Sequence, residues 1–210
     1  MFIFCRSPVS QLQRRKSAGY SLIELSIALS ILAVIIVGSL IGVQKILRTN
    51  AVNNELKGIP ETLASAQRLT SNLADLTGLN TLTFTQLGVW PQDRVVGAAA
   101  AATVSNHFGG RQFLNPNSNA LAGYAANQLF VLTLTNIPTE ACADIVSGMD
   151  RMALGLYVGA NQAQDPAGGL AGTTVKDATN AARSANLANL AGVCGAAGGA
   201  RIRLDMVVPR

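Results

Sequence analysis

Hydrophobic side chains are concentrated in one run near the start of the chain. From Leu25 to Val43, nineteen consecutive residues carry no charge, and serine is the only polar side chain among them. An α-helix rises about 1.5 Å per residue, so this run spans most of a bilayer core of roughly 30 Å. The first nineteen residues contain four basic residues and no acid, the basic ones being Arg6, Arg14, Arg15 and Lys16. This charge bias predicts one membrane-spanning helix with a cytoplasmic N-terminus and an external domain.

A helical pattern continues beyond the apolar run. Apolar residues recur at about 3.6-residue spacing with polar residues between them, as on an amphipathic helix. These apolar positions are Val52, Leu56, Ile59, Leu63, Ala66 and Leu73. We expect one helix from Ser21 to about Ser71, and we expect the amphipathic region over 45–74 to pack on a globular domain. Pro60, with Gly58 close by, is expected to kink this helix or to remove one of its hydrogen bonds.

The pattern over 75–210 predicts a domain of short elements. Gly and Pro residues interrupt 75–119, which indicates a connecting region with weak β character. After it, alternating and helical periodicities follow one another. We expect strands at 128–135, 153–158 and 200–208, helices at 139–151 and 181–193, and an exposed loop at 159–174. The fold class is therefore α+β, and Trp90, the only tryptophan, is expected to pack the long helix onto the domain.

Two cysteines lie in the part of the chain that the predicted topology places outside the cytoplasm. Cys142 and Cys194 form an even pair there, and disulfides persist in such compartments. Closing a loop of about 53 residues would stabilise the fold by about 4 kcal/mol on the chain-entropy model. A zinc site is the alternative, but the chain has no paired CxxC spacing and a single histidine. The pattern favours a disulfide, and His107 is expected to be a loop or packing residue.

Glu24 is an acid at the edge of the apolar run. A carboxylate inside hydrocarbon costs about 2.5 kcal/mol or more on insertion scales, and such residues usually mark a functional pairing. If the chain were cut between Gly19 and Tyr20, the new α-amino group could neutralise Glu24 of a neighbouring copy. The alternative is that Glu24 lies in the headgroup region and extends its carboxylate to water.

The N-terminal residues resemble the processing and assembly signature of type IV pilins and the related pseudopilins. The signature reads RRKSAG, followed by YSLIELSIALSILAVIIVGSLIGV. The resemblance implies a leader peptide over 1–19, which a prepilin peptidase removes after Gly19, and N-methylation of Tyr20. It also implies that the hydrophobic helix over 20–44 assembles a filament, in which Glu24 docks to the N-terminal amine of a neighbour.

Two glycines within the apolar run have the spacing of a helix-packing motif. Gly38 and Gly42 form GxxxG, which permits the close approach of a partner helix in a membrane or a helical bundle. The alternative is that both glycines only make the helix less stable, by about 1 kcal/mol each relative to alanine.

The order of elements after residue 128 resembles the C-terminal half of type IVb pilins. The resemblance implies the type IV pilin fold, in which the long helix packs on an antiparallel sheet of a head domain, here over 75–210. It also implies that a disulfide between Cys142 and Cys194 bounds an exposed C-terminal region. Tyr20 departs from this group, whose mature chains tend to start with an aliphatic residue.

The charge of the chain changes once the predicted leader is removed. The formal net charge is +5, with sixteen Lys and Arg against eleven Asp and Glu, and four of the basic residues lie in 1–19. The remaining chain is close to neutral, and no cluster of Lys and Arg follows Lys16. We therefore predict no specific nucleic-acid binding. A nearly neutral subunit suits dense self-association, because little charge repulsion opposes it.

The prediction is a structural protein and not an enzyme. The sequence shows no catalytic motif, and we expect no cofactor and no metal. The predicted function is a subunit of a type IV pilus, most like a type IVb major pilin. Its partners would be other copies, the prepilin peptidase and the assembly machinery of the bacterial inner membrane, where it resides before assembly into an extracellular pilus. The alternatives are a minor pilin, a type II secretion pseudopilin, or a membrane-anchored extracytoplasmic binding protein.

Overall fold

The computed structural model describes residues 21–180, 184–195 and 200–210, and the chain divides into two compact units. The first unit ends at Gln44, and the second runs from Lys45 to Arg210. The predicted leader, with Gly19, and Tyr20 lie outside the described residues, as does part of the predicted helix at 181–193.

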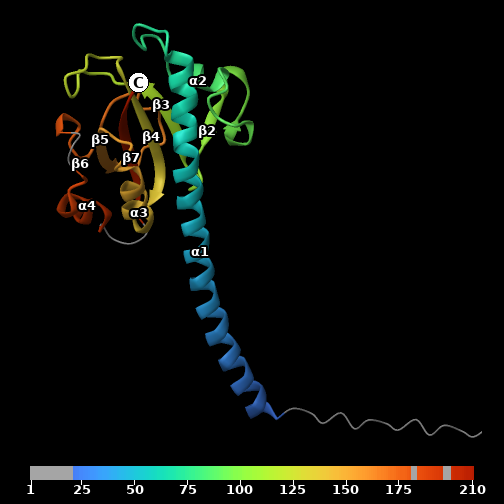
Figure 1. Cartoon of the computed structure of the whole chain (residues 1–210). Helices are drawn as coiled ribbons and strands as arrows, with labels where there is room; N and C mark the ends of the chain where they lie inside the picture. The colour runs from blue at the N-terminus through green and yellow to red at the C-terminus, as the bar shows by residue number, and fades with distance from the viewer. Residues whose placement is uncertain (1–20, 181–183, 196–199) are drawn as a thin grey trace, which may run out of the picture. The chain divides into compact units, whose positions relative to one another are not determined.

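The described part of the first unit is the first half of helix α1. This helix runs from Leu22 to Thr70 and is coloured blue to teal in Figure 1. Its most apolar 18-residue window has a mean hydropathy of 2.6 and no buried residue. Among the described residues, α1 is the one helix that is long and apolar enough to cross a membrane. A signal sequence near an N-terminus meets the same criteria of length and composition.

In the second unit, α1 continues to Thr70, and Pro60 lies inside it without ending it. The apolar face that the periodicity predicts is buried here, with Ile59 and Ala66 fully inaccessible. The helix ends before Leu73, which the periodicity had placed on the same face. Leu73 lies in a turn and is 42% exposed. Ser, Asn and Asp follow Thr70, and these side chains compete for backbone hydrogen bonds and so favour turns over helix.

The head contains one antiparallel sheet of seven strands in the order β1-β2-β3-β4-β7-β5-β6. Labels from β2 to β6 can be followed in this order in Figure 1. The strands are β1 Val95–Val96, β2 Thr103–Ser105, β3 Arg111–Pro116, β4 Leu129–Pro138, β5 Gly155–Ala160, β6 Thr173–Lys176 and β7 Arg201–Pro209. The other helices are α2 Thr81–Gln86, α3 Thr139–Met149 and α4 Leu187–Cys194, with 3-10 turns at Gln92–Arg94, Ala99–Ala101 and Ala178–Asn180.

Both faces of the two central strands are buried. On β4, Phe130 and Leu132 belong to the main core, which also contains residues of α1, α2 and α3. Val131, between them, belongs to a smaller apolar cluster with Val207 of β7. Successive side chains of a strand point to opposite faces, so β4 separates two buried layers. Leu170 packs against the smaller cluster, which indicates that the segment after β5 covers the second face.

Several predicted boundaries were wrong. The segment 75–119 is not simply a connection, because it contains α2, β1, β2 and β3, and β3 pairs with β4 over five residues. The predicted loop at 159–174 includes the start of β6, and α4 begins at Leu187 rather than at 181. These elements are two to eight residues long, and their stability comes from pairing with distant segments rather than from local pattern.

Candidate functional site

Glu24 lies in the first turn of α1 and caps that turn. The backbone N–H of Ser21 donates to Glu24 Oε2 at 3.1 Å, and the N–H of Leu25 donates to the Ser21 carbonyl at 3.1 Å. Ser21 and Glu24 thus have the spacing and one of the two bonds of a capping box. A carboxylate at this end of a helix also interacts favourably with the helix dipole. Both residues are exposed, so the Glu24 carboxylate is held in place but accessible.

The apolar surface that follows Glu24 has no covering layer within the described chain. Large side chains from Leu25 to Val43 are 51–74% exposed. The polar groups on this surface are satisfied locally, because the hydroxyls of Ser26, Ser30 and Ser39 donate to carbonyl groups one turn earlier. A Cβ added at Gly38 or Gly42 would meet no atom within 4 Å. This surface is therefore apolar, internally satisfied and open to a partner.

The second unit contains a buried carboxylate that sequence reasoning missed. Glu55, on the second half of α1, is 0% exposed. The Arg94 Nη2 group donates to its Oε1 at 2.9 Å and to its Oε2 at 3.0 Å. The backbone N–H of His107 donates to Oε2 at 3.1 Å, and the His107 ring nitrogen Nδ1 lies 2.7 Å from the same oxygen. The sequence does indicate that Glu55 is buried, because it lies three residues after Val52 and four before Ile59, on the apolar face of the helix.

Arg94 connects this carboxylate to the sheet. Its Nε donates to the Ser105 carbonyl at 3.1 Å, and the residue is 7% exposed. A Cβ at Gly58 would lie 3.0 Å from Arg94 Nη1. Gly58 therefore leaves room for the guanidinium, a different role from the kink that the sequence suggested. His107 lies in the loop between β2 and β3, as predicted, and is a polar partner of Glu55.

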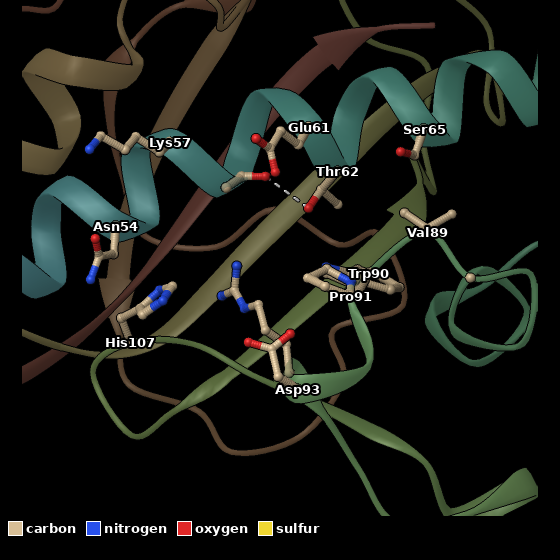
Figure 2. Close-up of a pocket in the computed structure, with 13 residues that line it drawn as sticks. Asn54, Lys57, Glu61, Thr62, Ser65, Val89, Trp90, Pro91, Asp93 and His107 are labelled. Carbon is tan, nitrogen blue, oxygen red and sulfur yellow. Dashed lines mark hydrogen bonds between the residues drawn. The ribbon is translucent and has the colours of Figure 1, made fainter.

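A polar groove of about 450 Å³ lies beside this cluster, between α1 and the segment that follows α2. Figure 2 shows Lys57, Glu61 and Ser65 on the α1 side, with Asp93 and His107 on the opposite side. Trp90 closes one end and is 2% exposed, so it packs between helix and domain as expected.

The charged residues beside the groove hold two segments of the second unit together. The Glu55 carboxylate is fully engaged by Arg94 and His107, which leaves it unavailable as a base. No group of three His, Cys, Asp or Glu residues among the described ones is placed to hold a metal ion. The arrangement instead fastens residues 88–110 to α1 through a buried ion pair and its hydrogen bonds.

The predicted disulfide is present. Cys142 of α3 and Cys194, the last residue of α4, are bonded with a Cα–Cα distance of 5.5 Å. Asp150, the residue that follows α3, is half-buried. Its Oδ1 lies 3.3 Å from Lys176 Nζ and accepts the backbone N–H of Ala185 at 3.0 Å. The disulfide thus joins α4 to α3, and the ion pair joins the end of α3 to β6.

A second buried ion pair lies on β7. Arg203 Nε donates to Asp205 Oδ1 at 2.7 Å, and both residues are nearly inaccessible. Burial raises the pKa of the Asp205 carboxyl, while hydrogen bonds from Arg203 and Thr133 oppose the shift. Asp205 Oδ2 also accepts the backbone N–H of Ala171, so the pair fastens the segment after β5 onto the sheet.

Comparison with known proteins identifies the family. The family model for the PilS N-terminal region matches residues 48–194, which is more than half of the chain. The chain belongs to the PilS family of type IV pilins. The prokaryotic N-terminal methylation motif matches residues 14–40 of this pilin, a stretch that includes Gly19, Tyr20 and Glu24. No curated protein matches this pilin significantly.

Solved structures of other pilins resemble this pilin over most of its length. The crystal structure of a type IVb pilin from Salmonella typhi is 23% identical, with 73% of this chain and 97% of that chain covered and a TM-score of 0.44. The NMR structure of the type IVb pilin PilS from Salmonella typhi is 18% identical, with coverage of 76% and 96% and a TM-score of 0.45. TcpA, a type IV pilin from the El Tor biotype of Vibrio cholerae, is 14% identical, with coverage of 75% and 98% and a TM-score of 0.49.

The predicted site residues of this pilin fall in separate places. Glu24, Gly38 and Gly42 lie on the exposed first half of α1. Cys142 and Cys194 are bonded in the head. The pilin fold itself is as expected, with a long N-terminal helix packed on an antiparallel sheet and a disulfide in the C-terminal region.

Proposed function

We propose that this pilin is the major structural subunit of a type IVb pilus and that it polymerises through the first half of α1. The observation that carries the proposal is the uncovered apolar surface from Leu25 to Val43, inside the match to the N-terminal methylation motif. Burial of such side chains contributes about 25 cal/mol per Å² of apolar surface removed from water. A contact between unlike surfaces of successive copies extends into a fibre when it does not close into a ring.

Processing prepares the subunit for this step. A prepilin peptidase in the bacterial inner membrane cleaves after Gly19 and methylates the amine of Tyr20. Before assembly the subunit stays in that membrane with its leader in the cytoplasm, and the assembly machinery then adds it to an extracellular filament. The match to the methylation motif supports this sequence of events.

Glu24 selects the position of an incoming subunit. Its Oε2 accepts the Ser21 N–H, whereas its Oε1 accepts no hydrogen bond within the described residues. The N-terminal amine of a neighbouring copy binds to this free oxygen. A charge taken into an apolar bundle is costly unless it is paired, so a subunit is retained only where carboxylate and amine meet. Gly38 and Gly42 allow the neighbouring helix to approach closely.

The test is Glu24→Ala, with Glu61→Ala as the matched control. Glu61 is also an exposed acid of α1, but it lies in the second half of the helix. We expect Glu24→Ala to accumulate in the membrane and to start at residue 20 by mass spectrometry, yet to yield few or no filaments in the fraction sheared from cells. Glu61→Ala should yield normal filaments. Normal filaments from Glu24→Ala would contradict the docking role, and a chain that keeps its leader would contradict the processing.

A further inference from the structure

The strand β6 lies at one edge of the seven-stranded sheet. It pairs with β5 on its inner side, and no further strand of the described sheet follows it. An edge strand presents main-chain groups to which another strand can bind. The segment Thr173–Val175 consists of β-branched residues, which favour strands, and it contains neither proline nor charge. If this edge were uncovered, a strand from another molecule could pair with it.

Two asparagines cover the edge. The backbone N–H of Asn186 donates to the Val175 carbonyl at 2.7 Å, and Asn189 Nδ2 donates to the Thr174 carbonyl at 2.8 Å. These two consecutive carbonyls of β6 are therefore occupied from outside the sheet. Asn186 is also the N-cap of α4, because its side chain accepts the N–H groups of Ala188 and Asn189.

The covering segment is fastened on both sides of these contacts. Before them, the Ala185 N–H donates to Asp150 Oδ1, which also pairs with Lys176 of β6. After them, Leu190 is 6% exposed in the main core, and Cys194 is bonded to Cys142. The disulfide thus holds the far end of a segment whose near end covers the strand.

We propose that residues 184–195 form an edge guard, which prevents β6 of one copy from pairing with β6 of a second copy. The occupant of an uncovered edge is a second copy of this chain, because two identical edges form a symmetric antiparallel pair. The guard gives the disulfide a purpose beyond restricting the unfolded chain: it keeps α4 on the sheet edge. Association of copies is then left to surfaces other than this edge.

The test uses the full chain in detergent micelles with the disulfide removed by Cys142→Ser/Cys194→Ser. Hydrogen exchange at the Asn186 and Ala185 amides reports the guard directly, because both amides donate its hydrogen bonds. We expect exchange there to accelerate at least about tenfold while the amides of β4 and β7 stay protected. Light scattering should show association beyond that of the unchanged chain. Unchanged exchange at Asn186, or an unchanged mass, would overturn the proposal.

Two further variants keep the proposal testable if the disulfide variant folds poorly. Asn186→Ala/Asn189→Ala retains the disulfide and should open the guard partly, whereas Asn50→Ala/Asn53→Ala, at exposed positions of α1, should not. Adding Thr173→Lys to either open form places a charge on the edge and should reverse the association. Association that persists with Thr173→Lys would show that another surface is responsible.

Discussion

Glu24 and Glu55 lie on the same helix, yet their surroundings are opposite. Glu24 is exposed, and within the described residues its carboxylate accepts one hydrogen bond, from the Ser21 backbone. Glu55 is fully buried, accepts three hydrogen bonds from Arg94 and the His107 backbone, and lies 2.7 Å from the His107 ring nitrogen Nδ1. The fold therefore supplies every partner that Glu55 needs, whereas Glu24 retains a free oxygen for a partner from outside the chain.

The apolar residues around the two acids follow the same division. Near Glu24 the large apolar side chains are exposed, and near Glu55 they form part of the main core. Substitutions in the second half of α1 should therefore change the stability of the head, and those in the first half should change assembly. Within the second unit, burial should decide how much each charged pair contributes to stability.

The largest effect is expected for Glu55→Ala. The substitution leaves the Arg94 guanidinium buried without its counter-charge, and breaking a buried pair in this way costs about 3–5 kcal/mol. Urea unfolding of the full chain in detergent, followed by Trp90 fluorescence, measures the loss. Trp90 is a suitable reporter because it lines the groove that also contains Arg94.

Glu61→Ala is the control for this experiment. It removes an exposed acid six residues along the same helix, and a surface substitution of this kind should change stability by less than about 0.5 kcal/mol. A Glu55→Ala loss as small as that of the control would mean that the buried cluster does not hold residues 88–110 on α1.

Much of the architecture could be predicted from sequence, because some elements have strong local signals. The apolar run and the periodicity after it predicted α1 to within about one residue at each end. The alternating pattern over 128–135 predicted most of β4, and the helical periodicity over 139–151 predicted α3. The cysteine count, together with the predicted compartment, predicted the bond between Cys142 and Cys194.

The missed features depend on contacts between distant residues. Strand β3 has a weak local pattern and is defined by its pairing with β4. Glu55 and Arg94 are 39 positions apart, so neither residue shows its partner in the sequence. On β7, Arg203 and Asp205 alternate with apolar residues, as an exposed strand face would. They are buried because the segment after β5 covers that face.

An intermediate effect is expected for the pH dependence of stability. Burial raises the pKa of the Asp205 carboxyl above its ordinary value of 3.8. The folded state therefore binds this proton more tightly than the unfolded state does. The stability that Asp205 contributes is largest at low pH and is lost as the pH rises through the raised pKa, with a slope of at most about 1.4 kcal/mol per pH unit.

Asp205→Asn removes this titration. The measured quantity is the slope of the unfolding free energy against pH, between about pH 4 and pH 7. We expect the unchanged chain to have a more negative slope than the variant over this window. Equal slopes would show that Asp205 has the same pKa in the folded and unfolded chains.

The smallest effect is expected for the exposed pair that Arg48 of α1 forms with Glu140 of α3. Their charged atoms are 3.8 Å apart, and their side chains are 36% and 45% exposed. A double-mutant cycle with Arg48→Gln and Glu140→Gln should give a coupling below about 0.5 kcal/mol, because water screens such pairs. The same cycle at Glu55 and Arg94 should give a much larger value. Both pairs join α1 to the rest of the second unit through an arginine and a glutamate. Equal couplings would mean that burial does not strengthen the Glu55–Arg94 pair relative to the exposed pair.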